Sequence, residues 1–273
     1  MIIGIDVGIS TTKIVGLKRG KPSAPIRITA ADPITSLYGA FGKYLHDNDV
    51  TLAEVEQVML TGVGAAYIEQ DVYGLPTTKV DEFVADALGA RYESKLDYAL
   101  VVSMGTGTSF VMCNNDDIRH IGGIGIGGGT LQGLSRLLLS TDDIKKVAAL
   151  AMQGNIGNVN LLIGDISAKP LPGLPMDATA SIFARAQIGA SREDVAAGLI
   201  MMVLQNIGSA AVLAAQGTDC RDMVLIGNLS LLPQCKEIFP QLEKLYNVRF
   251  HIPKYSEYCT AIGAALAFKK AIE

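Results

Sequence analysis

The sequence predicts an α/β protein built from two related halves with a cleft between them. Residues 2–17 read as a strand, a tight glycine turn rich in hydroxyl side chains, and a second strand. Residues 98–113 repeat this plan, with Gly105 at the place that Gly8 has in the first copy. The composition agrees, because 273 residues of which 49% are apolar and 18% charged can bury a large core.

The remaining patterns fill out the two halves, which we place at residues 1–95 and 96–273. In the first half we expect helices over residues 33–46, 51–56 and 79–92 and a strand over residues 57–61. In the second half we expect a helix after a glycine-rich run, further helices over residues 142–152, 191–215, 232–246 and 261–272, and strands over residues 223–226 and 248–252. Ser191 and Asp194 supply a capping signal for the longest helix.

The charge balance favours a small-molecule partner. A formal net charge of -4 and a pI near 5.5 give no basic surface for nucleic acid or an anionic membrane. The longest apolar stretch, residues 195–204, is too short to span a bilayer, and the first residues show no leader pattern, so we expect a cytoplasmic protein. Four scattered cysteines fit small core or loop residues in a reducing compartment: Cys113, Cys220, Cys235 and Cys259.

The first glycine turn has the chemistry of a phosphate site. Its backbone N–H groups and hydroxyls suit phosphate oxygens, Lys13 adds positive charge, and Asp6 is expected to hold Mg²⁺, which usually takes only one or two carboxylates. The residues expected to bind are Asp6, Gly8, Ser10, Thr11, Thr12 and Lys13. An ordinary hairpin with a polar turn is the alternative, and the second copy of the hairpin favours the phosphate site.

The glycine-rich run over residues 122–129 also suits phosphate. It lacks the Gly-Lys-Ser/Thr ending of a Walker A loop and the βαβ unit of a dinucleotide fingerprint. Glycines let the backbone close on an anion, and Gly128, Gly129 and Thr130 are expected to present the positive end of the following helix. A flexible loop is the alternative, but the run lies between a strand and a well-patterned helix.

Five motifs together carry a resemblance that extends over nearly the whole chain. They are GIDVGISTTK, KVDEF, SMGTGTS, RHIGGIGIGGGTLQGL and AIGAAL. This combination resembles the type II pantothenate kinases, a group with the duplicated actin-like (ribonuclease H-like) fold of acetate kinase, sugar kinases and Hsp70. The resemblance implies ATP-dependent phosphorylation of pantothenate, the first committed step toward coenzyme A, by a homodimer with a nucleotide cleft between its domains.

The resemblance also implies catalytic residues. The family's catalytic glutamate falls on Glu82 and its substrate-binding arginine on Arg119. A carboxylate that accepts the proton of a primary alcohol contributes about 10²–10⁴-fold to the rate, and an arginine can orient substrate oxygens or neutralise charge on the transferred group. Taken alone, Glu82 could instead cap its helix and Arg119 could make a surface ion pair. Asp81 is a rival base.

Further assignments follow from the same resemblance. Nucleotide contacts are expected from Thr106, Gly128, Gly129, Thr130, Leu131, Gln132 and Asn228, and substrate contacts from Ser103, Gly105, Thr108 and Arg119. The chain departs from the family pattern at Ile9, which replaces a glycine, and in the runs over residues 182–184, 227–230 and 256–260. The last of these stands where the family has Gly-Ala-Phe-Ser-Gly. These changes concern nucleotide affinity more than the class of reaction.

Two other readings remain open. A kinase of the same fold acting on a sugar or amino sugar is the first, although no sugar-kinase motif with an aspartate base is recognisable. The second is an ATPase that activates a radical dehydratase, because GIDVGISTTK resembles that group as well. Such activators hold an iron–sulfur cluster with cysteines at a dimer face, and no loop of that kind is evident. We expect residues 200–204 to form a dimer contact, with core burial as the alternative.

Overall fold

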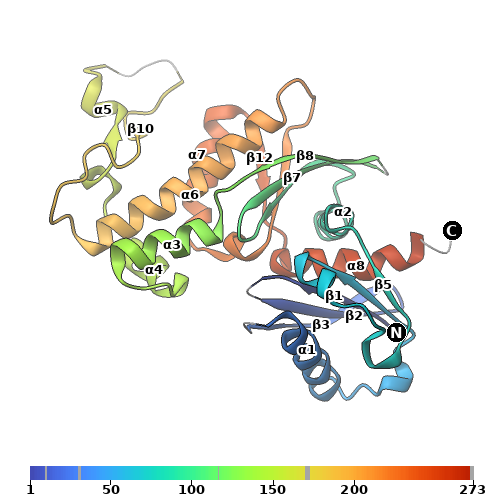
Figure 1. Cartoon of the computed structure of the whole chain (residues 1–273). Coiled ribbons are helices and arrows are strands. Elements are labelled where there is room, and N and C mark those ends of the chain that lie inside the picture. Colours follow the sequence, from blue (N-terminus) through green and yellow to red (C-terminus); the bar gives the residue numbers. More distant parts are fainter. Residues whose placement is uncertain (10, 30–31, 116, 170–172, 271–273) are drawn as a thin grey trace.

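Two five-stranded mixed sheets form the framework of the molecule, one from each half of the chain (Figure 1). The structure is a computed structural model that describes residues 1–9, 11–29, 32–115, 117–169 and 173–270. Both sheets have helices packed on their faces, so the expected α/β class is confirmed.

The first sheet has the strand order β3-β2-β1-β4-β5. Its strands are β1 (Ile2–Val7), β2 (Thr12–Lys18), β3 (Lys21–Ile28), β4 (Gln57–Thr61) and β5 (Thr77–Lys79). The first three pair antiparallel, whereas β4 and β5 continue the sheet in parallel. Helix α1 (Pro33–Asp47) covers one face, where Leu37 and Phe41 pack against Ile3 and Ile5. Short 3₁₀ helices occupy Leu52–Glu54, Val63–Tyr67 and Val72–Gly74.

The second sheet repeats the topology of the first. Its strands are β6 (Tyr98–Met104), β7 (Thr108–Asn114), β8 (Asp117–Ile124), β11 (Asp222–Ile226) and β12 (Arg249–His251), in the order β12-β11-β6-β7-β8. Three antiparallel strands are again followed by two parallel ones. The internal repeat inferred from the two hairpins therefore extends to whole sheets.

Four helices cover the outer face of the second sheet: α3 (Gly128–Leu139), α4 (Ile144–Ala151), α6 (Arg192–Ala214) and α7 (Cys235–Tyr246). A small arm, made of β9 (Leu161–Leu162), α5 (Ile163–Ile166) and β10 (Thr179–Ser181), extends away from both sheets in Figure 1. The remaining 3₁₀ helices are η4 (Ile156–Asn158), η5 (Asn228–Leu231) and η6 (Ser256–Tyr258).

Two helices lie between the sheets, α2 (Glu82–Ser94) and α8 (Cys259–Lys270) (Figure 1). Helix α2 packs against the second sheet, and α8 packs against β1, β2 and β4 of the first. The helices cross so closely that a Cβ atom on Gly89 would overlap the Cys259 carbonyl oxygen, and one on Gly263 would overlap that of Ala85. The last helix thus returns from the second half to the first sheet, and the division at residue 95 stays a prediction.

The longest helix, α6, confirms its expected cap but corrects two expectations, one on the length of its apolar stretch and one on a dimer contact. Its cap is confirmed, because the Ser191 hydroxyl accepts a hydrogen bond from the Asp194 N–H at 3.1 Å. With 23 residues, however, α6 is long and apolar enough by composition to cross a membrane, and 56% of the apolar window is buried in the protein. Ile200, Val203 and Leu204 lie in the core of their own subunit, so the expected dimer contact over residues 200–204 is wrong for these three.

Two expected helices are shorter than their patterns indicate. Residues 51–56 form only the 3₁₀ turn Leu52–Glu54, whose start is closed by a capping box between Thr51 and Glu54. The helix expected over residues 79–92 begins at Glu82, since Lys79 ends strand β5. These boundaries place Glu82 in the first turn of α2, where a helix presents its positive end.

Candidate active site

The first hairpin brings two predicted ligands into direct contact. Asp6 and Lys13 are opposite each other in the β1–β2 register, and Lys13 Nζ lies 3.3 Å from Asp6 Oδ2. Both side chains are buried. The Gly8 N–H closes the turn by donating to the Thr11 carbonyl oxygen at 3.0 Å. Ser10, also predicted to bind nucleotide, lies outside the described residues.

Thr12 has a different environment from the one its motif indicates. It is fully buried, and its hydroxyl accepts a hydrogen bond from Ser36 Oγ of α1 at 2.7 Å. The structure therefore gives Thr12 a part in packing α1 onto the sheet and does not present it to a ligand.

Residues from both halves of the chain meet beside the first turn. Asn228 Nδ2 in η5 donates to Thr11 Oγ1 at 3.5 Å, although 217 positions separate the two residues. Asn228 Oδ1 is buried and has no hydrogen-bond partner among the described residues. A buried acceptor without a partner is costly, so this atom is suited to meet a ligand that donates a hydrogen bond.

The second hairpin ends in a turn over residues 105–107, on which the start of α3 is docked. The N–H groups of Gly128 and Gly129 donate to the carbonyl oxygens of Gly105 and Thr106, at 2.8 and 2.9 Å. The glycine-rich run thus uses these two amides inside the protein, which corrects the expectation that they are free to bind phosphate. The N–H groups of residues 105–107 donate no hydrogen bond within the described part of the chain, and the turn is accessible.

The rest of the glycine-rich run and its helix are also reassigned. Gly122 and Gly123 belong to strand β8, which tolerates them at the edge of the sheet beside a bulge. Thr130 Oγ1 accepts from the Gly127 N–H as part of the helix cap. Leu131 is fully buried in the core, and Gln132 is exposed and donates to the Asp142 carbonyl oxygen at 3.4 Å. The structure does not bring these last two side chains to the turn.

Glu82 lies in an environment that raises the pKa of its carboxyl group. It is half-buried at the start of α2. Burial raises the pKa of its carboxyl group, and the negative charge of Asp6 raises that pKa further. The alternative in which Glu82 caps the helix fails, because Asp81 is the cap and accepts from the Val84 N–H at 3.0 Å. The same contact occupies Asp81, the rival base.

The Arg119 side chain is exposed on β8 and makes no hydrogen bond or ion pair with the side chain or backbone of another described residue. Its neighbour His120 stacks on Phe83, with the ring centroids 3.9 Å apart. Side chains alternate along a strand, and Arg119 pairs with Met112, so it leaves β8 on the face opposite to His120. The structure therefore joins β8 to the start of α2 but does not place the Arg119 guanidinium beside Glu82.

Three further polar side chains lie on β7, β6 and α2. Thr108 Oγ1 donates to the Ile126 carbonyl oxygen at 2.8 Å and so ties the hairpin to the loop before α3. Ser103, near the end of β6, is half-buried. Asp86, which the sequence reading missed, is fully buried on α2, and burial raises the pKa of its carboxyl group to about 7. The only sequence signal was its position four residues after Glu82.

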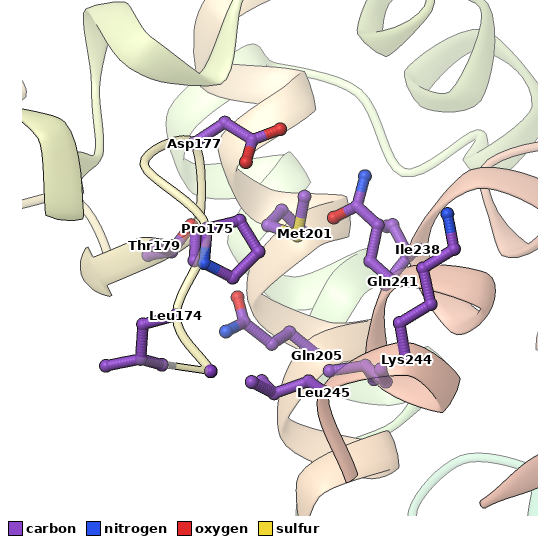
Figure 2. A pocket seen from close by; sticks show the side chains of 13 residues that line it. Leu174, Pro175, Asp177, Thr179, Met201, Gln205, Ile238, Gln241, Lys244 and Leu245 are labelled. Carbon is purple, nitrogen blue, oxygen red and sulfur yellow. The ribbon is translucent and has the colours of Figure 1, made fainter. Parts of the chain in front are cut away.

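A separate cavity of about 570 Å³ lies between α6, α7 and the segment over residues 173–179 (Figure 2). Its walls are mostly apolar, with Met201, Ile238 and Leu245 among them, and Gln205 and Gln241 add amide groups. None of the residues predicted for nucleotide or substrate lines this cavity.

The duplicated sheets and facing hairpin turns define the class, which is the actin-like ATPase and sugar-kinase fold. The chain is similar to the activator of the 2-hydroxyisocaproyl-CoA dehydratase from Clostridium difficile with bound ADPNP, with a TM-score of 0.72, 18% identity, and 99% of this chain and 95% of that chain covered. It is also similar to a ROK family protein from Streptococcus pneumoniae in complex with sucrose, with a TM-score of 0.61, 14% identity, and 99% and 98% covered.

Within this class, the chain belongs to the Fumble family, whose model matches residues 91–266. It is 32% identical over 192 residues to a type II pantothenate kinase of Bacillus cereus, covering 67% of this chain and 66% of the relative. It is 27% identical over 235 residues to one of Bacillus anthracis, covering 83% and 82%. The resemblance seen in the sequence motifs is therefore confirmed.

Proposed function

We propose that this protein transfers the γ-phosphoryl group of ATP to the primary hydroxyl group of pantothenate, as its relatives are named to do. One observation of the structure carries the proposal. Glu82, a half-buried carboxyl group with a raised pKa, stands at the start of α2 within the electrostatic reach of the Asp6–Lys13 hairpin. A base and a phosphate-binding turn at one place are what phosphoryl transfer to an alcohol requires.

Residues of both halves are available to hold the nucleotide. The amides over residues 105–107 and the Lys13 ammonium group suit phosphate oxygens, and the unpartnered Asn228 Oδ1 suits a donor on the nucleoside. Asp6 offers one buried carboxylate, which fits Mg²⁺ because this ion keeps most of its waters. When bound, Mg²⁺ would neutralise charge on the transferred phosphate.

Glu82 would act on the acceptor. In its ionised form, the carboxylate accepts the hydroxyl proton while the oxygen of the alcohol attacks phosphorus, and burial makes it a stronger base than an exposed glutamate. Arg119 has an exposed side chain on the edge strand β8, and its guanidinium group is the one we propose to bind the acceptor's carboxylate.

The dehydratase activator is the second candidate function, because its fold is the more similar of the two structures compared. All four cysteines of this chain are buried, at Cys113, Cys220, Cys235 and Cys259. A cluster held across a dimer face requires cysteines at the surface, so the kinase is the better supported function.

A coupled assay with ATP tests the proposal directly. Purified protein is expected to form 4′-phosphopantothenate and ADP in equal amounts. A parallel screen with sugars and amino sugars covers the related kinases. Phosphorylation of a sugar without phosphorylation of pantothenate would contradict the proposal, as would iron bound in stoichiometric amount.

We also propose a cytoplasmic homodimer. Buried free cysteines suit a reducing compartment. Leu137 and Leu138, two consecutive residues of α3, are exposed and offer apolar surface for a second copy. Light scattering after size-exclusion chromatography is expected to give twice the mass of one chain.

A further inference from the structure

Asp86 stands behind Glu82 on the same side of α2, because residues four positions apart share a helix face. It is fully buried. Thr260, the second residue of α8, donates from Oγ1 to Asp86 Oδ1 at 2.6 Å. The other oxygen, Asp86 Oδ2, is buried without a hydrogen-bond partner among the described residues.

Packing alone does not call for a carboxyl group at this position. The helix crossing is otherwise built from small residues of α2, among them Ala85, Ala87 and Gly89. A buried polar group with an unsatisfied oxygen is costly, and an apolar side chain would fill the space at lower cost. The Asp86–Thr260 pair is therefore a feature that stability alone does not explain.

Four polar side chains influence the ionisation of Asp86, and two of them, Glu82 and Asp6, belong to the candidate site. The charges of Glu82 and Asp6 disfavour its ionised form, whereas the hydroxyls of Thr260 and Ser103 favour that form. Burial is the largest influence and raises the pKa to about 7. Near neutral pH the carboxyl group thus carries its proton for much of the time, and its neutral form adds little negative charge behind Glu82.

We propose that Asp86 is a positioning residue, which ties α2, the helix that carries Glu82, to Thr260 on α8 and so fixes the base relative to the acceptor pocket. The inference rests on the proposed function, because it takes Glu82 as the base. The Asp86 carboxyl group itself touches no reacting atom. Its effect is to hold the first turn of α2 in one place while Glu82 accepts the proton.

Four variants of this pair separate positioning from packing. Asp86→Asn keeps the shape and an acceptor for Thr260, and Thr260→Ser keeps the donor. Asp86→Ala removes the acceptor, and Thr260→Val removes the donor. Because small displacements of a base are costly in rate, kcat is expected to fall about tenfold or more in Asp86→Ala and Thr260→Val and to stay within about threefold in Asp86→Asn and Thr260→Ser. The KM for ATP is expected to stay within about twofold of the wild type in all four variants.

Tyr44→Phe is the matched control for loss of a buried hydrogen bond. Tyr44 is buried in the first half, where its hydroxyl contacts Ser23 at 3.2 to 3.3 Å. This variant is expected to lower Tm and leave kcat unchanged. If Asp86→Ala also lowers Tm while its kcat stays within about twofold of the wild type, Asp86 only packs the helices and the inference is overturned.

The same experiments distinguish a failure of the positioning role of Asp86 from a failure of the proposed function. If the wild-type protein does not phosphorylate pantothenate but accepts another alcohol, the proposed function fails. The same kcat ratios are then measured with that acceptor, or as ATP hydrolysis if no acceptor is found. Equal rates for Asp86→Ala, Thr260→Val and the wild type in that assay would overturn the positioning role by themselves.

Discussion

The Thr11 hydroxyl accepts a hydrogen bond from the Asn228 side chain across the boundary between the two halves of the molecule. This contact joins the turn of the first hairpin to the loop after β11, and the buried Asn228 Oδ1 beside it has no partner among the described residues. The two halves therefore share a polar site at the place where the nucleotide is proposed to bind.

Asn228→Ala is expected to weaken nucleotide binding. The substitution removes both the contact to Thr11 and the free acceptor, and loss of one hydrogen bond to a ligand costs about tenfold in affinity. Isothermal titration calorimetry with a non-hydrolysable ATP analogue measures the change. Asn206→Ala, which loses a contact within α6 to the Met202 carbonyl oxygen, serves as the control. Equal affinities for both variants would remove Asn228 from the site.

Glu82→Gln is expected to lower kcat by about 10²–10⁴-fold while ATP still binds, because the amide cannot accept the proton. Asp81→Asn is the matched control, since asparagine caps a helix as well as aspartate does, and its kcat is expected to stay within about twofold of the wild type. The reverse pattern of rates would make Asp81 the base.

The pH dependence of kcat/KM provides a second test of Glu82. Its carboxyl group must be ionised to accept a proton, and burial raises its pKa above the ordinary value of 4.5. Activity is therefore expected to fall as the pH drops through this raised pKa, and the acid limb of the profile should lie above pH 4.5. An acid limb at or below that value would show that a different group titrates.

The stability of Asp86→Asn relative to the wild type is expected to depend on pH, because only the wild type carries the titrating carboxyl group. Burial raises the pKa of Asp86 from 3.8 to about 7, so the folded protein binds this proton more tightly than the unfolded chain does. The stability linked to the proton is complete below pH 3.8 and is lost as the pH rises through about 7. The asparagine side chain does not titrate, so the variant keeps its stability as the pH rises through about 7. In urea denaturation, the free energy of unfolding of the variant relative to the wild type is therefore expected to rise by about 1–3 kcal/mol between pH 5 and pH 8.5. A constant difference between the two proteins would contradict the raised pKa.

Two glycines of α3 are expected to respond in opposite directions to alanine. A Cβ atom on Gly129 would lie 2.8 Å from Thr106 Cγ2, so Gly129→Ala is expected to loosen the docking of α3 and cost about 1–3 kcal/mol. A Cβ atom on Gly133 meets nothing within 4 Å, and Gly133→Ala is expected to stabilise the helix by about 1 kcal/mol. Chemical denaturation of both variants measures the difference, and equal destabilisation would mean that the docking is not specific to Gly129.

The elements that could be predicted have strong local signals. The two hairpins alternate apolar residues around glycine turns, and α6 carries its own cap at Ser191. Strand β3 was missed because its Pro22 and Pro25 resemble loop signals, which an edge strand tolerates. The expected start of α2 is too early, because the strand β5 precedes the helix and is only three residues long, too short to show the alternation of a strand.

The site was predictable only where a motif carried it. Glu82 follows from the family pattern, and its environment agrees. The role of Gly128 and Gly129 did not follow, because a glycine that approaches a phosphate and one that approaches a neighbouring carbonyl group look alike in sequence. Asp86 depends on Thr260, which lies 174 positions away, and no local pattern reports such a contact.

The return of α8 to the first sheet determines the order in which the protein can fold during synthesis. One face of that sheet carries Ile2, Leu17 and Met59, and these side chains pack against Ala264 and Ala265 of α8. The ribosome makes the strands of this sheet well before it makes α8. That face of the sheet therefore stays open to water or to chaperones until α8 has emerged.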